Sequence, residues 1–259
     1  MQKIIDAHIH MDLYNEFEQK EILTTLEQND IAGLITVSNH LESAKKNLEL
    51  AKEYENVFPA FGFHPEQVLP KENEMVKLIN FIKQHENEMV AIGEVGLPYY
   101  LRKEEKDIEL EAYLELLEQF ILLAKEMDKP IILHAIYEDA PLACSLLEKH
   151  SVTNAHFHWF KGDQKTLERI KANGYYISFT PDITYKKEIQ NIAENFPLSK
   201  VMVETDGPWQ FKGPFHNQMT NPNMIHESMR VIASIKQVNL QEAYGQIYQN
   251  TKDFYKIRG

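Results

Sequence analysis

The sequence predicts an α/β protein of the (β/α)8 class, a TIM barrel in a single domain. Short aliphatic or β-branched runs alternate along the chain with longer segments whose apolar residues recur every three or four positions. Eight such runs can be counted, and eight parallel strands with crossover helices fit a closed barrel better than an open sheet. No Gly/Ser linker or low-complexity segment divides the chain. We therefore expect residues 1–259 to form one barrel domain.

Each element is predicted from its own pattern. The strands are expected at residues 3–10, 33–38, 57–64, 89–95, 130–135, 154–160, 175–180 and 200–206. The helices between them are expected at residues 16–29, 41–55, 72–85, 104–127, 140–149, 164–173 and 183–195. Asn173 and Gly174 have the composition of a helix C-cap, and Asp182 could cap the helix that follows. Residues 207–222, rich in Pro, Gly and aromatics, predict a loop over one face, followed by the final helices through residue 258.

Composition restricts the classes of function and the compartment. The formal net charge of −12 argues against a broad phosphate-binding surface, although bound metal ions could still create a local positive site. Cys144 is the single cysteine, which excludes an intrachain disulfide and fits a reducing compartment. No stretch approaches the roughly 18 to 20 apolar residues of a membrane span. We therefore expect a cytoplasmic protein with no membrane contact, and no pattern indicates an obligate protein partner.

Ionisable residues gather at the ends of the predicted strands. In a (β/α)8 barrel these carboxyl ends meet at the face where reacting groups are found. His8 and His10, two residues apart on a strand, share a face and could bind one metal ion, or they could be two ordinary polar side chains. The full set of strand-end candidates is His8, His10, His64, Glu94, His134, His156, His158, Glu204 and Asp206.

This mixture of imidazoles and carboxylates without thiolates predicts a divalent metal centre. Such donors suit Zn²⁺, Mn²⁺, Ni²⁺ or Fe²⁺ and tolerate Mg²⁺. Four histidines and two carboxylates exceed what one catalytic ion with an open position takes. Two ions, roughly 3.5 to 4 Å apart and bridged by a carboxylate, would use them all, and Glu94 is the natural bridge.

Six motifs in this order resemble the TatD family of metal-dependent hydrolases within the amidohydrolase-like barrels. They are DAHIHMD, GFHPE, IGEVGL, PIILH, HWFKG and ETDGP, and they extend along nearly the whole chain. The resemblance implies that His8, His10, Glu94 and Asp206 surround one metal ion. It also implies that Glu94, His134 and His158 surround the second, and that His64 contacts the substrate. Glu204 is a further candidate, for a hydrogen bond to a ligand histidine.

Two positions depart from the family pattern. Pro98 stands where the family commonly has Asp, and Ile136 lies where members often carry Arg shortly after the fifth-strand histidine. An arginine there would suit phosphate recognition, so its absence weakens the case for a nucleic-acid substrate more than the case for metal-dependent hydrolysis. Arg102, Lys161 and Lys212 could bind an anion instead, although solvated loop charge is the favoured interpretation. Trp159, Trp209 and Phe211 could stack on a base or pack the rim.

The predicted function is hydrolysis of a phosphodiester, as in a deoxyribonuclease acting on a DNA end or oligonucleotide. Two divalent ions would generate hydroxide, with Glu94 as the bridging ligand and Asp206 as the general base. The alternative keeps the metals and changes the bond to an amide, ester or lactone of a small molecule. A non-catalytic metal-binding protein is a third alternative, which the complete set of six ligands disfavours.

Overall fold

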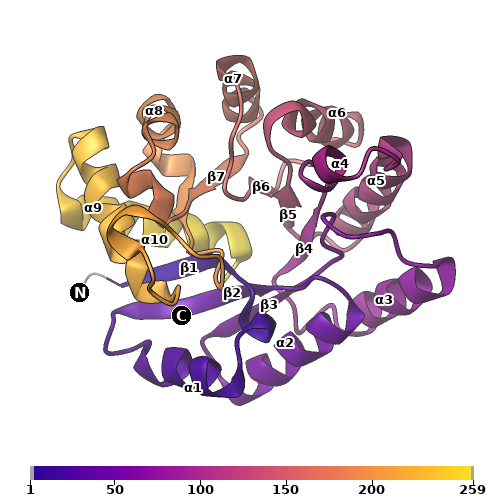
Figure 1. Cartoon of the computed structure of the whole chain (residues 1–259), viewed down its shortest axis with the longest axis horizontal. Coiled ribbons are helices and arrows are strands. Elements are labelled where there is room, and N and C mark those ends of the chain that lie inside the picture. The colour runs from indigo at the N-terminus through magenta and orange to yellow at the C-terminus, as the bar shows by residue number, and fades with distance from the viewer. Residues whose placement is uncertain (1–2, 258–259) are drawn as a thin grey trace.

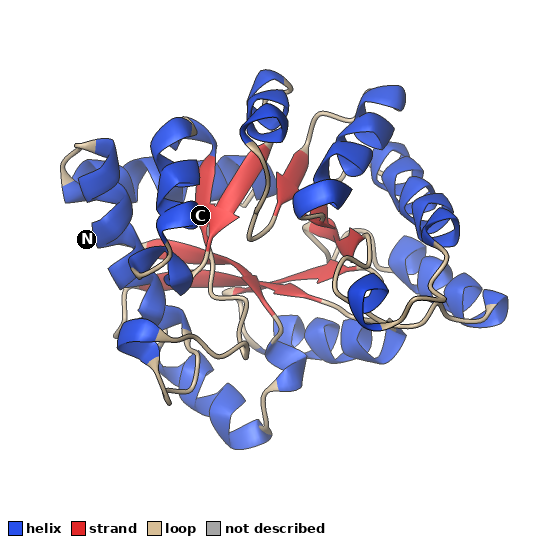
Figure 2. Cartoon of the chain, turned by 45° about the horizontal axis from the view of Figure 1, so that its top comes forward, coloured by secondary structure: helices blue, strands red, loops and turns tan. Residues whose placement is uncertain are grey.

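The protein, described by a computed structural model over residues 3–257, is a barrel of eight parallel strands surrounded by helices (Figure 1). The strands pair in sequence order, each with the next along the chain. Figure 2 shows the strands inside the ring of helices. The predicted fold class is therefore confirmed. The strands are β1 (Ile4–Ile9), β2 (Ile31–Val37), β3 (Val57–Phe61), β4 (Ala91–Gly96), β5 (Ile131–His134), β6 (Ala155–Phe157), β7 (Tyr176–Phe179) and β8 (Val201–Val203).

The last strand meets the first through the residues that follow β8. The backbone N–H of Asp206 donates to the carbonyl of His8 at 2.9 Å, and the N–H of His10 donates to the carbonyl of Gly207 at 2.8 Å. These bonds hold the ends of β1 and β8 side by side. The side chains of His8, His10 and Asp206 therefore start from neighbouring points on the barrel wall.

Each of the seven predicted crossover helices overlaps a helix of the structure. No helix within residues 3–257 is long and apolar enough to cross a membrane. The last helix ends at Tyr255, and residue 258, where we expected it to end, lies outside the described part of the chain. The helices are α1 (Glu16–Thr25), α2 (Leu41–Glu53), α3 (Glu72–Gln84), α4 (Leu101–Glu104), α5 (Leu110–Glu126), α6 (Ala140–Lys149), α7 (Gln164–Ala172), α8 (Lys187–Asn195), α9 (Ile225–Lys236) and α10 (Leu240–Tyr255).

Two helix predictions were wrong in their starting points. Residues 104–127 were expected to form one helix, but α4 ends at Glu104 and α5 begins at Leu110. The intervening residues 105–109 are charged except for Ile108 and offer no apolar face to pack. The helix expected from residue 183 begins at Lys187. Asp182 does not cap it, because its carboxylate accepts hydrogen bonds from the Thr180 hydroxyl at 2.6 Å and the Trp159 indole at 2.9 Å.

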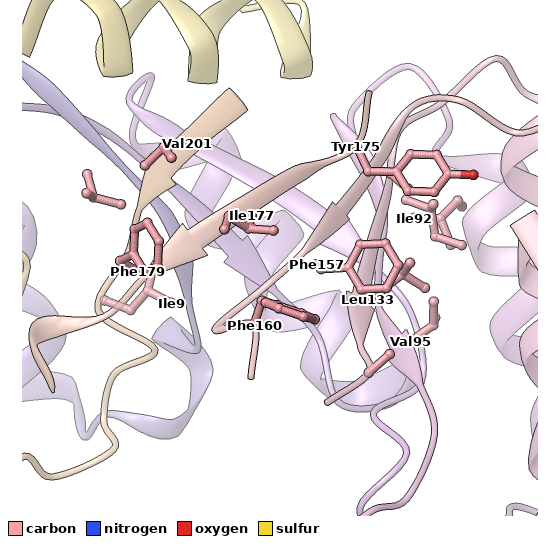
Figure 3. Close-up of a cluster of buried hydrophobic side chains, with 14 of the residues drawn as sticks. Ile9, Ile92, Val95, Leu133, Phe157, Phe160, Tyr175, Ile177, Phe179 and Val201 are labelled. Atoms are coloured by element: carbon pink, nitrogen blue, oxygen red, sulfur yellow. The ribbon is translucent and has the colours of Figure 1, made fainter. Parts of the chain in front are cut away.

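A large apolar cluster fills the layer between the barrel and its helices. It combines outward-facing strand residues with the inner faces of the helices, for example Leu117 and Phe120 of α5. Figure 3 shows its strand side, including Ile92, Val95 and Leu133. Burial of these large side chains stabilises the barrel by the hydrophobic effect, which contributes roughly 1.5 to 3 kcal/mol for each fully buried aliphatic or aromatic residue.

A second apolar cluster lies on the inner faces of the strands and includes Ile5 and Ala7 of β1, Ala91 of β4 and Tyr255 of α10. Side chains alternate between the two faces of a regular strand, so with Ile5 and Ala7 pointing inward His8 would point outward. The pairing of β1 with β2 shifts register between Asp6 and Ile9, and the pairing of β4 with β5 shifts between Ile92 and Val95. These irregularities bring His8 and Glu94 onto the inner face.

Candidate metal centre

Six side chains from five strands converge at the carboxyl end of the barrel. All lie in or directly after the strands in which they were expected, and each is buried or nearly so. The strands predicted at 154–160 and 200–206 end earlier, at Phe157 and Val203, so their site residues stand on the loops that follow. The six residues are His8, His10, Glu94, His134, His158 and Asp206.

Glu94 lies at the centre and directs its two oxygens toward two different pairs of histidines. Oε2 is 3.3 Å from Nε2 of His8 and 3.4 Å from Nε2 of His10. Oε1 is 2.9 Å from Nδ1 of His134 and 2.6 Å from Nε2 of His158. One carboxylate thus serves both halves of the site.

Asp206 completes the first half. Its Oδ1 atom is 3.4 Å from Nε2 of both His8 and His10. The same two imidazole nitrogens therefore face Glu94 from one direction and Asp206 from another. The rings of His8 and His10 lie 5.2 Å apart edge to face, and His8 stacks on His158 with ring centroids 3.9 Å apart.

The electrostatics of the site favour a bound cation. Burial alone would raise the pKa of Glu94, but the histidines around it hold that pKa well below its usual range. Burial would likewise lower the pKa of His10, but Asp206 and Glu94 raise it to about 10. The two carboxylates thus require positive charge beside them. A divalent ion supplies that charge and leaves the imidazoles neutral as ligands.

Unsatisfied polar atoms point to the same conclusion. Within residues 3–257, neither ring nitrogen of His8 has a hydrogen-bond partner, and Oε2 of Glu94 also lacks one. Burial lowers the pKa of His8, so its imidazole is neutral and keeps a lone pair. Buried donors and acceptors without partners cost about 1 to 3 kcal/mol each, unless a ligand satisfies them. The residues present therefore fit a metal ion in chemistry and in position.

His64 lies beside this set but has a different hydrogen-bond arrangement. Its Nε2 atom is 3.6 Å from Oε2 of Glu94, and its Nδ1 accepts the backbone N–H of Glu66 at 3.2 Å. Because Nδ1 acts as an acceptor, the neutral ring carries its proton on Nε2, facing the site. Burial lowers the pKa of His64 to about 3. His64 is thus a neutral donor at the edge of the metal centre, although its position also places it within a potential ligand group with Glu94 and His134.

Sequence reasoning missed Glu66, which lies in the GFHPE motif two residues after His64. Its Oε1 atom is 3.1 Å from Nε2 of His134. Its carboxylate also accepts the backbone N–H groups of Tyr100 at 2.9 Å and Leu101 at 2.6 Å. Glu66 thereby fixes the ring of His134 and connects it to the loop after β4. Its place in the motif was the available signal, but the contact depends on the fold of that distant loop.

Asp6 was also missed, in the DAHIHMD motif. Its carboxylate accepts the backbone N–H of Thr205 at 3.0 Å and the Thr205 hydroxyl at 2.5 Å. A third bond comes from the N–H of His8 at 3.2 Å. Asp6 thus ties β1 to the residues after β8 and sets the spacing of His8 from Asp206.

A hydrogen-bonded floor lies beneath the metal centre. His156 contacts the Tyr255 hydroxyl through Nδ1 at 2.8 Å and the Ser178 hydroxyl through Nε2 at 2.7 Å. Ser178 is also 2.6 Å from Oε2 of Glu204, whose Oε1 accepts the N–H of Trp159 at 2.7 Å. Glu204 was expected to hydrogen-bond a ligand histidine, but its Oε1 lies 3.6 Å from Nδ1 of His158, too far for a hydrogen bond. Glu204 therefore fixes the backbone just after His158.

The rim contains a cavity of about 950 Å³ that opens onto His10, His64, His134, His158 and Asp206. Its wall is partly aromatic and partly charged. The size suits a ligand of nucleotide or drug dimensions. The wall also includes Glu66, Tyr100, Glu104, Trp159, Lys161, Lys186 and Trp209.

We predicted solvated side chains for Arg102, Lys161 and Lys212, and this prediction was wrong for two of them. Lys161 is only 6% exposed and lines the cavity. Arg102 forms an ion pair with the buried Asp139. Lys212 is exposed, as expected. The long Lys161 side chain is buried because Trp159 and Tyr100 close over it, an arrangement that the loop sequence alone does not indicate.

A closely spaced set of histidines and carboxylates at the carboxyl end of a (β/α)8 barrel is typical of a metal-dependent enzyme such as a hydrolase. The chain belongs to the TatD-related DNase family, whose sequence profile matches residues 5–256. It is 39% identical over 255 residues to an "uncharacterized metal-dependent hydrolase" of Haemophilus influenzae, with 98% of this chain and 100% of that protein covered.

Two further relatives extend the comparison. The chain is 27% identical over 266 residues to the deoxyribonuclease TATDN3 of Homo sapiens, with 98% of this chain and 96% of that protein covered. Its fold is similar to that of YJJV, a TatD homolog from Escherichia coli, with a TM-score of 0.89, 24% identity and full coverage of both chains. The predicted family membership is thus confirmed.

Proposed function

We propose that the protein is a two-metal phosphodiesterase that hydrolyses the ends of DNA or oligonucleotide strands. The observation that carries this proposal is the orientation of Glu94, whose oxygens face one pair of histidines at 3.3 and 3.4 Å and another pair at 2.9 and 2.6 Å. Such a carboxylate is suited to bridge two cations. Membership of a family described as TatD-related DNases supports a nucleic-acid substrate.

The two halves of the site would each hold one divalent ion. His8, His10, Glu94 and Asp206 would hold the first, and Glu94, His134 and His158 the second. Zn²⁺, Mn²⁺, Ni²⁺ and Mg²⁺ are all compatible with this donor set. Bound ions would supply Lewis acidity, polarising the phosphoryl oxygen and lowering the pKa of a water molecule toward 7.

Asp206 is the proposed general base. Burial would raise the pKa of its carboxyl, but the nearby imidazoles, first that of His10 with Nε2 3.4 Å from Oδ1, lower it below its usual value. The group is therefore ionised at neutral pH and able to accept a proton from the attacking water. Asp206 also lines the cavity, so water and substrate reach it together.

His64 is the proposed substrate donor. With Nδ1 occupied by the N–H of Glu66, its Nε2–H faces the region where Oε2 of Glu94 lies. A neutral donor there can hydrogen-bond a phosphoryl oxygen and stabilise the charge that grows on it during the reaction. Glu66 and Glu204 act indirectly, by orienting His134 and the backbone after His158.

The test is an activity assay on the purified protein with Mn²⁺ or Mg²⁺. Labelled single-stranded DNA, bis(p-nitrophenyl) phosphate and a panel of amides, esters and lactones are assayed side by side. We expect metal-dependent release of nucleotides from DNA that Asp206→Ala abolishes. Nucleolysis that survives this substitution would come from a contaminant and would remove the support for the proposal.

A small-molecule amide, ester or lactone is the second candidate substrate class. Besides Asp206, two further carboxylates, Glu66 and Glu104, line the cavity, and the formal net charge is −12; both features disfavour long polyanions. Turnover of panel members without turnover of DNA would select this alternative. A non-catalytic protein would be indicated by less than one equivalent of bound metal after reloading. The buried, lone Cys144 fits a reducing compartment, and we propose the cytoplasm as the location.

A further inference from the structure

Lys161 is a buried cation that the proposed metal chemistry does not use. It lies in the HWFKG segment after β6, is 6% exposed and lines the cavity above the metal centre. Among the described residues 3–257, no carboxylate forms an ion pair with its ammonium group. A buried charge without a counterion is costly, so such groups normally have one.

Two other cations near the cavity do have acidic partners. Lys186 pairs with Asp182 at 2.9 Å, and Arg102 pairs with Asp139. Both partners are buried acids that hold these cations against the protein. Lys161 alone among these three cations keeps its charge available to a ligand in the cavity.

The surroundings of Lys161 hold the ammonium group in place while leaving its hydrogen-bonding capacity largely free. The Nζ atom lies 3.7 Å from the centre of the Trp159 ring and 3.3 Å from the Tyr100 hydroxyl. The backbone carbonyl of Lys161 accepts the N–H of Tyr137 at 2.6 Å, which joins the loops after β5 and β6. An ammonium group has three donors, and Tyr100 occupies only one.

An exposed aromatic side chain lines the same cavity as this cation. Trp209 is 59% exposed, lines the same cavity and contacts Trp159 edge to face with ring centroids 5.8 Å apart. Its backbone N–H donates to the carbonyl of Asp206 at 3.1 Å, which fixes it beside the metal centre. An exposed indole that shares a cavity with a desolvated cation matches a base and a phosphate of one nucleotide.

We propose that Lys161 binds the phosphate next to the scissile phosphodiester of an oligonucleotide, while Trp209 stacks on the adjoining base. This inference rests on the proposed function and adds the substrate group that the enzyme recognises. Burial lowers the pKa of Lys161 to about 8, with Asp182 and Asp206 opposing that effect. The group is therefore charged yet poorly hydrated at pH 7, and a phosphate can bind it with little further desolvation of the amine.

The catalytic test uses the trinucleotide TpTpT and its two analogues in which one phosphate is replaced by a neutral methylphosphonate. Lys161→Met should lower kcat/KM for TpTpT by about 10- to 100-fold, the value of a charge-assisted hydrogen bond. Bis(p-nitrophenyl) phosphate, which lacks a second anionic group, should be hydrolysed as by the wild type. At least one analogue has the neutral methylphosphonate in place of the phosphate that Lys161 would bind. For that analogue Lys161→Met should have no effect, because the interaction is already absent.

Two control variants separate recognition from packing. Lys161→Arg keeps the charge and should retain most of the activity on TpTpT. Lys212→Met removes an exposed cation outside the cavity lining and should change nothing. If Lys161→Met lowers activity on TpTpT and bis(p-nitrophenyl) phosphate equally, or on neither, Lys161 does not recognise a neighbouring phosphate and the inference fails.

A binding measurement distinguishes failure of the inference from failure of the proposed function. TpTpT and inorganic phosphate are titrated calorimetrically into metal-free protein. TpTpT binding that weakens at least tenfold in Lys161→Met but not in Lys212→Met supports the inference, even if DNA is not cleaved. Equal TpTpT affinity in wild type and Lys161→Met overturns it, even if DNA is cleaved. Lys161-dependent binding of inorganic phosphate without that of TpTpT also overturns it.

Discussion

His8 and His156 are equally buried inside the barrel but have opposite surroundings. Both ring nitrogens of His156 have hydrogen-bond partners, Tyr255 at 2.8 Å and Ser178 at 2.7 Å. Within residues 3–257 neither nitrogen of His8 has one. A buried polar group with partners adds stability and fixes a geometry, whereas one without partners costs stability. The contrast separates a structural floor from a site prepared for a ligand.

Glu94→Gln should have the largest effect, because it changes the residue shared by both halves of the site. The amide keeps the shape of the side chain but cannot bridge two cations as a carboxylate does. We expect activity to fall roughly 10³-fold or more and bound metal to fall below that of the wild type. Steady-state kinetics and elemental analysis measure both. Unchanged metal content with unchanged kcat would show that Glu94 bridges nothing.

Metal removal should destabilise the wild type and leave the hydrogen bonds of His156 intact. An ion present at 100 times its dissociation constant adds about 2.7 kcal/mol of stability. For a chain of this length that corresponds to a shift of roughly 5 to 10 °C in Tm. Thermal unfolding with EDTA and then with added Mn²⁺ measures the shift. His8→Asn should abolish most of it, and a shift of full size in that variant would contradict a metal role for His8.

Tyr255→Phe tests the hydrogen-bonded surroundings of His156. Loss of the hydroxyl leaves Nδ1 of His156 buried without its partner, so the free energy of unfolding should fall by about 1 to 3 kcal/mol. Urea unfolding in EDTA measures this change. Metal content should stay at the wild-type value. A variant with normal stability and lost metal would instead place Tyr255 in the function of the site.

The smallest expected effect concerns the pH dependence of TpTpT binding to metal-free protein. Burial, assisted by Lys186, lowers the pKa of Lys161 to about 8 against the opposing effects of Asp182, Asp206 and Glu188. The charged form that binds phosphate is present below pH 8 and is lost above it. Affinity should therefore fall about tenfold between pH 7 and 9. Calorimetry measures it, and Lys161→Arg, which stays charged, should remove the decline.

The sequence was sufficient for the alternation of strands and helices and for the strand ends that carry the site. Prediction from sequence failed at residues 105–109, a short segment without an apolar face that interrupts the expected helix. It also failed at Asp182, which was expected to cap a helix but accepts a hydrogen bond from Trp159, a residue distant in the sequence. Glu66 was missed for the same reason. Its partners Tyr100 and His134 lie far along the chain and meet it only in the folded barrel.

The sequence by itself determined the barrel and the chemistry of its mouth, because hydrophobic periodicity and the order of His, Glu and Asp at strand ends are local properties. Only the tertiary structure decided which of these side chains point inward. Register shifts in β1 and β4 turn His8 and Glu94 toward one another, against strict alternation from Ile5 and Ala91. The burial of Lys161 beneath two aromatic rings was decided in the same way. Pairing between strands and packing between loops depend on residues distant in sequence, so a local sequence pattern does not predict them.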